Sequence, residues 1–280
     1  MSTQPQGMTA EQSAAVAPYF TNLDQPVFAL INLPETVKGA LFARYSRAAK
    51  PLRQLFHDEF YSAVQAAPPD SVVGLDRADK LYQKVFNEYG DDSVAQLGGV
   101  HLAVEDASNI LTKVLERGRL MAYLEQSTRY IPYTERRGGT WRYLVPTELD
   151  GHPLREQYVE TMDAAFEVYA RWIEPMRVWF ERRYPKAPGD SDGVYRSAIR
   201  AKALDTLRGL LPAATQSNVG IYGTGQAYES LLLRMRAHPL AEARATADLM
   251  LTELRKVIPA FLTRVDQPER GGRWSQYFAD

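Results

Sequence analysis

The residues best suited to chemistry lie in one short stretch, RGRLMAYLEQSTRY, which spans residues 117–130. It holds three arginines, one glutamate and one serine. Side chains of an extended chain alternate between two faces, so Glu125, Ser127 and Arg129 would share one face. A carboxylate, a hydroxyl and a guanidinium on one face can bind a ligand that carries a phosphate and hydroxyl groups. The stretch therefore predicts a positively charged hollow, built from the bend after residue 116, for a phosphorylated ligand.

Two other interpretations of this stretch remain open. The apolar positions 107, 110, 111, 114 and 115 follow a helical period, and Gly118 stands where a glycine commonly ends a helix. The charges that follow could be no more than the solvated surface of a helix end, since isolated surface charges contribute little. Ser127 could also act as a nucleophile, but no histidine or lysine lies near it in the sequence to activate it. Only the fold could supply such a base.

Composition limits the classes of function. The chain has 280 residues, of which 45% are hydrophobic, and this suits one large domain. We expect a disordered, polar tail over residues 1–17 and a single domain over 18–280. A net charge of −1 provides no basic field for nucleic acid, and no apolar stretch reaches membrane length. No signal peptide is visible, so we expect a cytoplasmic protein.

The absence of cysteine and the scatter of histidine exclude several kinds of site. Without cysteine the chain has no disulfide, no thiolate nucleophile and no cysteine-bound cluster. The four histidines show no metal-ligand spacing, so we predict no metal site. Arginine accounts for 25 of the 33 basic residues, because only 8 are lysine. A GC-rich genome explains most of these arginines, and we assign a function to a few.

Helical periodicity dominates the chain, and strand signals are few. Arg137-Gly138-Gly139-Thr140 could turn a hairpin between Tyr133 and Tyr143. The apolar stripe that runs from Tyr158 to Trp179 predicts a core-facing helix, which Pro175 should kink. The residues 220–225, GIYGTG, are not a dinucleotide-binding loop, because the glycine order differs and no apolar strand precedes them. The predicted helices cover residues 35–66 with a kink at Pro51, 77–89, 107–115, 154–183, 194–210, 224–237 and 240–265.

The stretch 117–130 resembles, without a gap, the signature RHRxxSxNExSxRY of the flavin-dependent thymidylate synthases. The matching positions are Arg117, Arg119, Glu125, Ser127, Arg129 and Tyr130. The departures are Gly118 for histidine, Ala122 for the first serine and Leu124 for asparagine. The chain therefore resembles a divergent member of that family.

Other stretches support the resemblance in the right chain order. Residues 43–46, ARYS, are similar to the family's ARxS, and 207–212, LRGLLP, to its ARxxLP. Residues 90–94, GDDSV, are similar to GHxSV, with Asp91 in place of a flavin-contacting histidine. The family's NAR falls on Thr224-Gly225-Gln226, where the match is poor, and its later arginine falls near Arg234 and Arg236.

The resemblance implies an α+β fold, with helices around a central sheet, and reductive methylation of uracil at C5. Methylenetetrahydrofolate would supply the carbon, FAD the hydride, and NADPH would reduce the flavin, in a homotetramer with shared active sites. No protein nucleophile is needed, which agrees with a chain that lacks cysteine. The implied catalytic residues are Ser127 and Arg129. The implied substrate-binding residues are Glu125, Gln126, Ser127, Arg129, Arg208, Arg234 and Arg236. The implied cofactor-binding residues are Ser46, Asp91, Ser93, Arg117, Arg119, Glu125, Thr224, Gln226 and Ser230.

The departures from the family pattern leave three hypotheses open. The enzyme could hold FAD through other residues and accept UMP as well as dUMP, as relatives in nucleoside-antibiotic pathways do. Thr224, Gln226 or Ser230 could then bind the 2′-hydroxyl. Alternatively the chain could be a non-catalytic paralogue that only binds a nucleotide or a flavin. The third hypothesis is a structural helical protein whose similarity to the family is due to chance.

Overall fold

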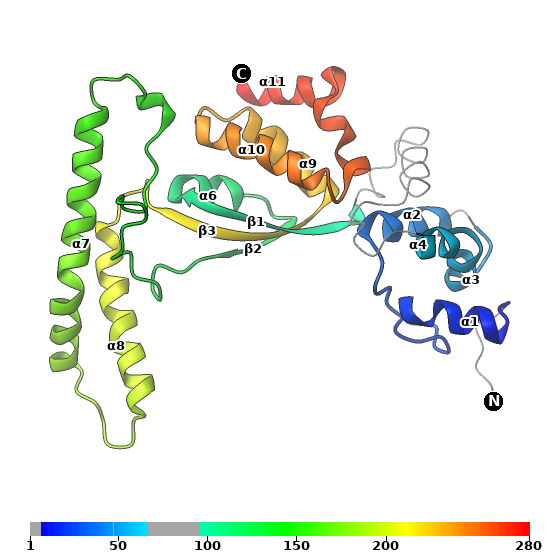
Figure 1. Ribbon diagram of the computed structural model, residues 1–280, viewed down its shortest axis with the longest axis horizontal. Coiled ribbons are helices and arrows are strands. Elements are labelled where there is room, and N and C mark those ends of the chain that lie inside the picture. Colours follow the sequence, from blue (N-terminus) through cyan, green and yellow to red (C-terminus); the bar gives the residue numbers. More distant parts are fainter. Residues whose placement is uncertain (1–6, 47, 67–95) are drawn as a thin grey trace.

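A three-stranded antiparallel sheet forms the centre of the computed structural model, which describes residues 7–46, 48–66 and 96–280 (Figure 1). Strand β3 (Gln216–Thr224) lies in the middle and pairs with both β1 (Gly99–Ser108) and β2 (Met121–Glu125). Helices lie on one face of this small sheet and at both of its ends, and they make up most of the described chain. The predicted helix-rich α+β class is confirmed.

One face of the sheet is covered and the other is bare. Helices α6 (Asn109–Leu115), α9 (Gly225–Arg236) and α10 (Ala241–Leu254) lie on the covered face (Figure 1). Along β3 the side chains alternate, so Val219 and Ile221 are buried beneath these helices. On the opposite face Leu124 is 81% exposed and Tyr222 is 44% exposed. The sheet therefore contributes only one face to the hydrophobic core.

Side-chain caps fix the points where strands turn into helices. The Ser108 hydroxyl accepts a hydrogen bond from the Leu111 amide at 3.0 Å and begins α6. The Thr224 hydroxyl accepts one from the Ala227 amide at 3.3 Å and begins α9. The strand β3 thus leads directly into α9, and the predicted helix over 224–237 is confirmed.

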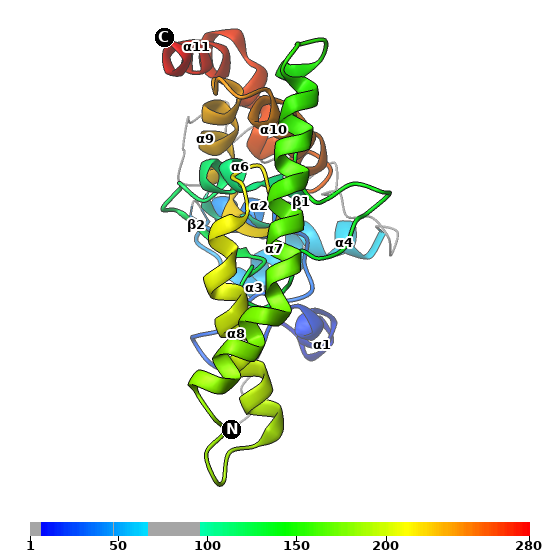
Figure 2. The ribbon, with the colours of Figure 1, turned by 90° about the vertical axis from the view of Figure 1, so that its left-hand side faces the viewer.

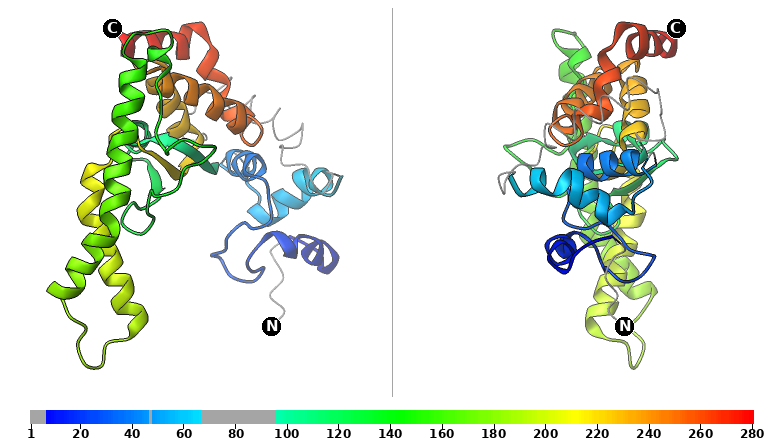
Figure 3. Two further views of the ribbon diagram at one scale, coloured as in Figure 1. Left: turned by 60° about the vertical axis from the view of Figure 1, so that its left-hand side comes forward. Right: turned by 90° about the vertical axis from the view of Figure 1, so that its right-hand side faces the viewer.

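The N-terminal helices form a separate layer at one end of the sheet (Figure 3). The helix predicted over 35–66 is divided: it ends first at Tyr45, and a new helix begins after Pro51, whose missing amide is tolerated at a helix start. The helices are α1 (Ala10–Val16), α2 (Glu35–Tyr45), α3 (Leu52–Phe56) and α4 (Ser62–Ala66), with 3₁₀ helix η1 (Ala17–Tyr19) after α1 and π-helical turn η2 (His57–Tyr61) before α4.

The prediction of a disordered tail over residues 1–17 is wrong for residues 10–16, which form α1. Thr9 and Gln12 make a reciprocal capping box at its start, and Val16 is fully buried. Local hydrogen bonds and one buried apolar side chain thus order a segment whose composition is polar. The assignment of residues 18–280 to a single domain stays a prediction.

A long helical hairpin, α7 (Arg155–Arg183) and α8 (Asp192–Leu207), projects from the opposite end of the sheet (Figure 2). The predicted core stripe of α7 holds only near the body, where Phe166 and Tyr169 are fully buried. Trp172 and Trp179 are 46% and 54% exposed, so the prediction is wrong for the outer half. The reason is that α8 is the main partner of α7 there, and one neighbouring helix cannot bury a whole stripe.

Of the hairpin predicted around residues 137–140, only the turn is present. Arg137 and Thr140 make an isolated bridge, and no strand extends to Tyr133 or Tyr143. The Trp141 and Tyr143 rings pack instead on Phe166 of α7, at ring distances of 5.6 and 5.7 Å. Packing of these aromatic side chains takes the place of strand pairing.

Shorter elements complete the described chain. The helix predicted over 240–265 ends at Leu254, because Pro259 cannot donate the amide that would continue it. The predicted helix 77–89 lies outside the described residues. No helix in the described ranges is both long enough and apolar enough to span a bilayer. The shorter elements are η4 (Thr147–Leu149), η5 (Arg208–Leu210), η6 (Pro259–Asp266), η7 (Pro268–Gly272) and α11 (Arg273–Ala279).

Candidate functional site

A cavity of about 610 Å³ lies between the end of β2 and the segment that links α8 to β3. It brings together four of the predicted site residues, although Arg208 is separated from the others by some 80 positions of sequence. Two further charged groups in the lining, Lys113 and Asp205, were not predicted. The side chains that carry the argument below are Lys113, Glu125, Gln126, Ser127, Tyr133, Asp205, Arg208 and Thr215.

Strand pairing and short turns hold the two sides of the cavity together. The Gln126 amide donates to the Asn218 carbonyl at 2.8 Å, which extends the pairing of β2 with β3 by one residue. On the other side, the Thr215 amide donates to the Pro212 carbonyl at 2.9 Å. The Asn109 amide in turn donates to the Thr215 carbonyl at 2.8 Å. Backbone hydrogen bonds therefore fix the lining in place.

Lys113 lines the same cavity as Ser127, although the two residues are not close in the sequence. Its ammonium donates to the carboxylates of Glu125, at 2.9 Å, and Glu116, at 3.2 Å. Burial alone would lower the pKa of Lys113, but these two hydrogen bonds outweigh burial and raise it above its ordinary value. Lys113 is therefore protonated at neutral pH and cannot accept the proton of Ser127. This argues against Ser127 as a nucleophile.

Two arginines share one carboxylate at the rim of the cavity. Asp205 Oδ1 accepts from Arg129 Nε at 3.3 Å and lies 2.9 Å from a terminal guanidinium nitrogen of Arg208. The Arg129 amide also donates to the Ser127 hydroxyl at 3.3 Å. Two cations and one anion leave a net positive charge, and guanidinium groups suit phosphate. The sequence feature that could have indicated Asp205 is its position three residues before Arg208, a spacing that lets two helical side chains form an ion pair. The same spacing is common among surface charges without a function, so it did not single out Asp205.

The two ends of the stretch 117–130 do not meet in this chain. Arg117 and Arg119 are exposed on the turn before β2, whereas Glu125 and Ser127 lie at its other end. Five residues of strand hold the ends about 14 Å or more apart. The expectation of one hollow built from the bend after residue 116 is therefore wrong within a single chain, because a strand intervenes.

The glycine at position 118 has a structural explanation. The Tyr123 hydroxyl donates to the Gly118 carbonyl at 2.9 Å. A Cβ at position 118 would lie 2.8 Å from that hydroxyl oxygen, so a histidine could enter only if Tyr123 moved. A terminal guanidinium nitrogen of Arg234 would lie 3.6 Å from the same Cβ. At position 118 the Tyr123 side chain of β2 therefore occupies the space that a histidine side chain would need.

The remaining predicted residues lie outside the cavity. Arg234 donates to the Ser230 hydroxyl at 3.0 Å. Thr224 caps α9, and Gln226 accepts a hydrogen bond from Gln96 at 2.6 Å. The Ser46 hydroxyl donates to the Ala43 carbonyl at 2.8 Å. Asp91 and Ser93 lie outside the described residues, and no cluster of metal-ligating side chains occurs within the ranges described.

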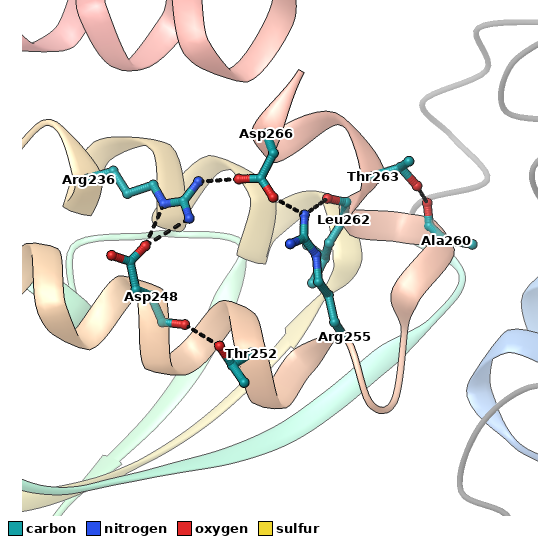
Figure 4. Close-up of polar contacts among 8 residues, drawn as sticks. All are labelled: Arg236, Asp248, Thr252, Arg255, Ala260, Leu262, Thr263 and Asp266. Carbon is teal, nitrogen blue, oxygen red and sulfur yellow. Dashed lines mark hydrogen bonds and ion pairs between the residues drawn. The ribbon is translucent and has the colours of Figure 1, made fainter. Parts of the chain in front are cut away.

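Arg236 belongs to a structural network rather than to the cavity (Figure 4). Its guanidinium lies 2.8 Å from Asp248 Oδ1 and 2.6 Å from Asp266 Oδ1. Asp266 also pairs with Arg255 at 2.5 Å. The network joins α9, α10 and η6, so Arg236 stabilises the cover of the sheet and is not positioned to bind a ligand in the cavity.

The charge network predicts a pH-dependent contribution to stability. The hydrogen bond from Arg236, assisted by Arg255, lowers the pKa of Asp266. A lowered carboxyl pKa stabilises the fold above the unfolded value of about 3.9, and the contribution disappears as pH falls through the folded value. Asp266→Asn should therefore lower the free energy of unfolding by on the order of 1 kcal/mol at pH 7 and by less at pH 3.

Urea unfolding at the two pH values measures this difference. Glu160→Gln, an exposed substitution on α7, is the control and should leave the free energy of unfolding unchanged at both. An equal loss for Asp266→Asn at pH 7 and pH 3 would mean that the carboxylate charge is not the cause.

A family model described as thymidylate synthase complementing protein matches residues 41–260. A protein described as "UPF0159 protein" from Chlamydia muridarum is 40% identical over 262 residues, which cover 91% of this chain and 50% of that protein. The chain thus spans about half the length of this relative. A flavin-dependent thymidylate synthase from Clostridium tetani is 26% identical over 193 residues, covering 67% of this chain and 72% of that enzyme.

The fold is also similar to that of a solved structure. The crystal structure of a UMP/dUMP methylase, PolB, from Streptomyces cacaoi, bound with 5-Br dUMP, has a TM-score of 0.50 against this chain. The alignment covers 81% of this chain and 88% of the other, at 17% identity. Identity at this level supports the similarity of the fold alone.

Proposed function

Because the chain belongs to the family of thymidylate synthase complementing proteins, which includes the flavin-dependent thymidylate synthases, we propose that it methylates a uridine 5′-monophosphate. The reaction would be reductive C5-methylation of dUMP, UMP or both, with methylenetetrahydrofolate as carbon donor and NADPH as reductant. The observation that carries the proposal is the cavity in which Arg208 meets Glu125, Gln126 and Ser127. Of these residues, Glu125, Ser127 and Arg208 are positions at which the chain matches the family's motifs.

The residues of the cavity would bind and orient the nucleotide. Arg129 and Arg208, already aligned by Asp205, would take the phosphate through charge-assisted hydrogen bonds. The Ser127 hydroxyl would add a further hydrogen bond at the same end. Glu125 is held by Lys113 and would accept from a sugar hydroxyl. In this arrangement Ser127 and Arg129 position the substrate and form no covalent bond with it.

FAD would supply the hydride of the reaction. Among the residues proposed for the flavin, only Glu125 lines the cavity, and Arg117 and Arg119 are exposed about one strand length away. One chain, over its described ranges, does not gather a flavin site. Exposed arginines could complete a site at a boundary between subunits, so we propose a homotetramer, whose mass would be four times 31.6 kDa.

A direct assay tests the proposed activity. The purified full chain, supplied with FAD, NADPH and methylenetetrahydrofolate, should convert dUMP or UMP into its 5-methyl derivative, detected by mass spectrometry. Light scattering on the same sample gives the mass, and its visible spectrum shows whether flavin is retained. Omission of the folate is the control and should abolish the product.

The alternative is a non-catalytic paralogue that binds a nucleotide or a flavin. For either function we propose a cytoplasmic location. Gly118, Asp91 and the poor match at 224–226 favour such a paralogue, because each departs from a family position. Binding of nucleotide without any methylated product would support this alternative. A colourless protein that takes up no added FAD and forms no product would refute the proposed methylation.

A further inference from the structure

One carboxylate oxygen links two arginines across the rim of the cavity. Arg129 follows β2 on one side of the rim, and Arg208 follows α8 on the other. Asp205 Oδ1 lies 3.3 Å from Arg129 Nε and 2.9 Å from a terminal guanidinium nitrogen of Arg208. Among the described residues, Asp205 is the only carboxylate that forms an ion pair with either guanidinium. It therefore connects two segments of the chain that are 76 positions apart.

The backbones of both arginines are fixed, whereas the orientation of their side chains depends on Asp205. The Arg129 amide donates to the Ser127 hydroxyl at 3.3 Å, and the Arg208 amide donates to the Leu204 carbonyl. The two arginine side chains are 48% and 43% exposed, and a solvated arginine side chain adopts many rotamers. Two guanidinium groups also repel each other. Contact with the same carboxylate oxygen offsets this repulsion and restricts both side chains.

We propose, resting on the function proposed above, that Asp205 is a positioning residue, which holds Arg129 and Arg208 in the orientation that binds the nucleotide phosphate. A guanidinium has five N–H donors, and Asp205 contacts only one nitrogen of each arginine, so other donors remain for phosphate oxygens. Asp205 carries a negative charge, like the phosphate, and repels it. It thus acts through the two arginines and does not bind the nucleotide.

Two effects of Asp205 on phosphate binding have opposite signs. Its charge weakens binding by repulsion, whereas the alignment of the arginines strengthens binding, because side chains that are already ordered lose less conformational entropy. Each long side chain that must be immobilised on binding weakens the affinity by roughly two- to tenfold. Repulsion between solvated charges is screened by salt. At physiological salt the alignment of two arginines should therefore outweigh the repulsion.

Replacement of Asp205 by alanine and by asparagine separates the two effects. Asp205→Ala removes both the charge and the acceptor, and should weaken binding of dUMP and UMP about tenfold, although the rim becomes more positive. Asp205→Asn removes the charge but keeps one acceptor oxygen, which is all that the two contacts require. This variant should bind both nucleotides within about threefold of the wild-type affinity. Isothermal titration calorimetry of the full chain at physiological salt, without folate or NADPH, measures the affinities.

Uridine and deoxyuridine, which lack the phosphate, show whether the effect passes through the two arginines. Displacement titrations should give the same nucleoside affinity for wild-type protein and for Asp205→Ala, because only the phosphate uses the aligned guanidinium groups. A general disturbance of the cavity would instead weaken nucleosides and nucleotides alike. The matched control is Asp192→Ala, which removes an exposed aspartate from the same helix but outside the cavity. It should leave all these affinities unchanged.

The outcomes separate this inference from the proposed function. Tighter nucleotide binding by Asp205→Ala, or equal affinities of the alanine and asparagine variants, overturns the positioning role and leaves nucleotide methylation standing. Equal weakening of nucleoside and nucleotide binding also overturns it. Wild-type protein that binds neither nucleotide overturns both. The thermal midpoint shows whether each variant is folded, and Asp205→Leu, which also lacks an acceptor, replaces the alanine variant if that variant is not.

Discussion

Replacing Arg208 by alanine is expected to weaken nucleotide binding by about 2 kcal/mol, or roughly thirtyfold, because it removes a charged hydrogen-bonding partner of the phosphate. Arg208 lies at the start of η5, next to the cavity, and its guanidinium is already aligned by Asp205. Arg208→Lys keeps the charge but not the bidentate geometry, and should recover only part of the lost affinity. Titration calorimetry with UMP and dUMP measures all three proteins.

The control is Arg196→Ala, an exposed arginine on α8 that does not line the cavity. It removes the same charge from the helix that leads into η5 and should change the affinity by less than about twofold at physiological salt. Equal losses for the two alanine variants would mean that the effect is a general one of net charge. Unchanged affinity in Arg208→Ala would exclude this arginine from the phosphate site.

The part of the site that the sequence predicted is the part that follows a family signature. Arg208 is far from Glu125 and Ser127 in the chain, and periodicity alone could not have joined it to them. Lys113 and Asp205 were missed because each is an ordinary charged position on a helix. Their importance depends on the pairing of β2 with β3, which places one beside Glu125 and the other between two arginines.

Long helices were predictable and strands were not, for physical reasons. α7 is 29 residues long and its apolar residues recur at a helical period, a pattern too long to arise in a turn or a short strand. β3 contains two glycines and alternates between buried and exposed positions because α6, α9 and α10 cover only one of its faces. Its identity as the central strand depends on its two partners, β1 and β2, which are close to it only in space. Arg236 shows the same limit, because Asp248 and Asp266 become its partners only after α10 and η6 pack on α9.

Phe261 is expected to be the most sensitive core position outside the site. It is fully buried in η6, and its ring fills the space beside two glycines at the seam where β1 begins and β3 ends. A Cβ would lie 2.6 Å from the ring at Gly98 and 2.5 Å from it at Gly225. Phe261→Ala should lower the free energy of unfolding by about 3–5 kcal/mol, because it leaves a cavity at this seam. Urea unfolding at neutral pH measures the loss.

Two further variants test whether contact with the glycines is the cause. Phe278→Ala removes a ring that is 44% exposed on α11 and should cost less than about 1 kcal/mol. Gly98→Ala should cost about 1–3 kcal/mol by overpacking, because the atoms nearest to its new methyl group all belong to the Phe261 ring. In Gly98→Ala combined with Phe261→Ala, the new methyl group enters the emptied space, so the double variant should lose less than the sum of the two. Strict additivity would show that the two residues do not share this space. The seam and the nucleotide cavity lie at opposite ends of β3, so folded Phe261→Ala protein should still bind nucleotide with nearly normal affinity.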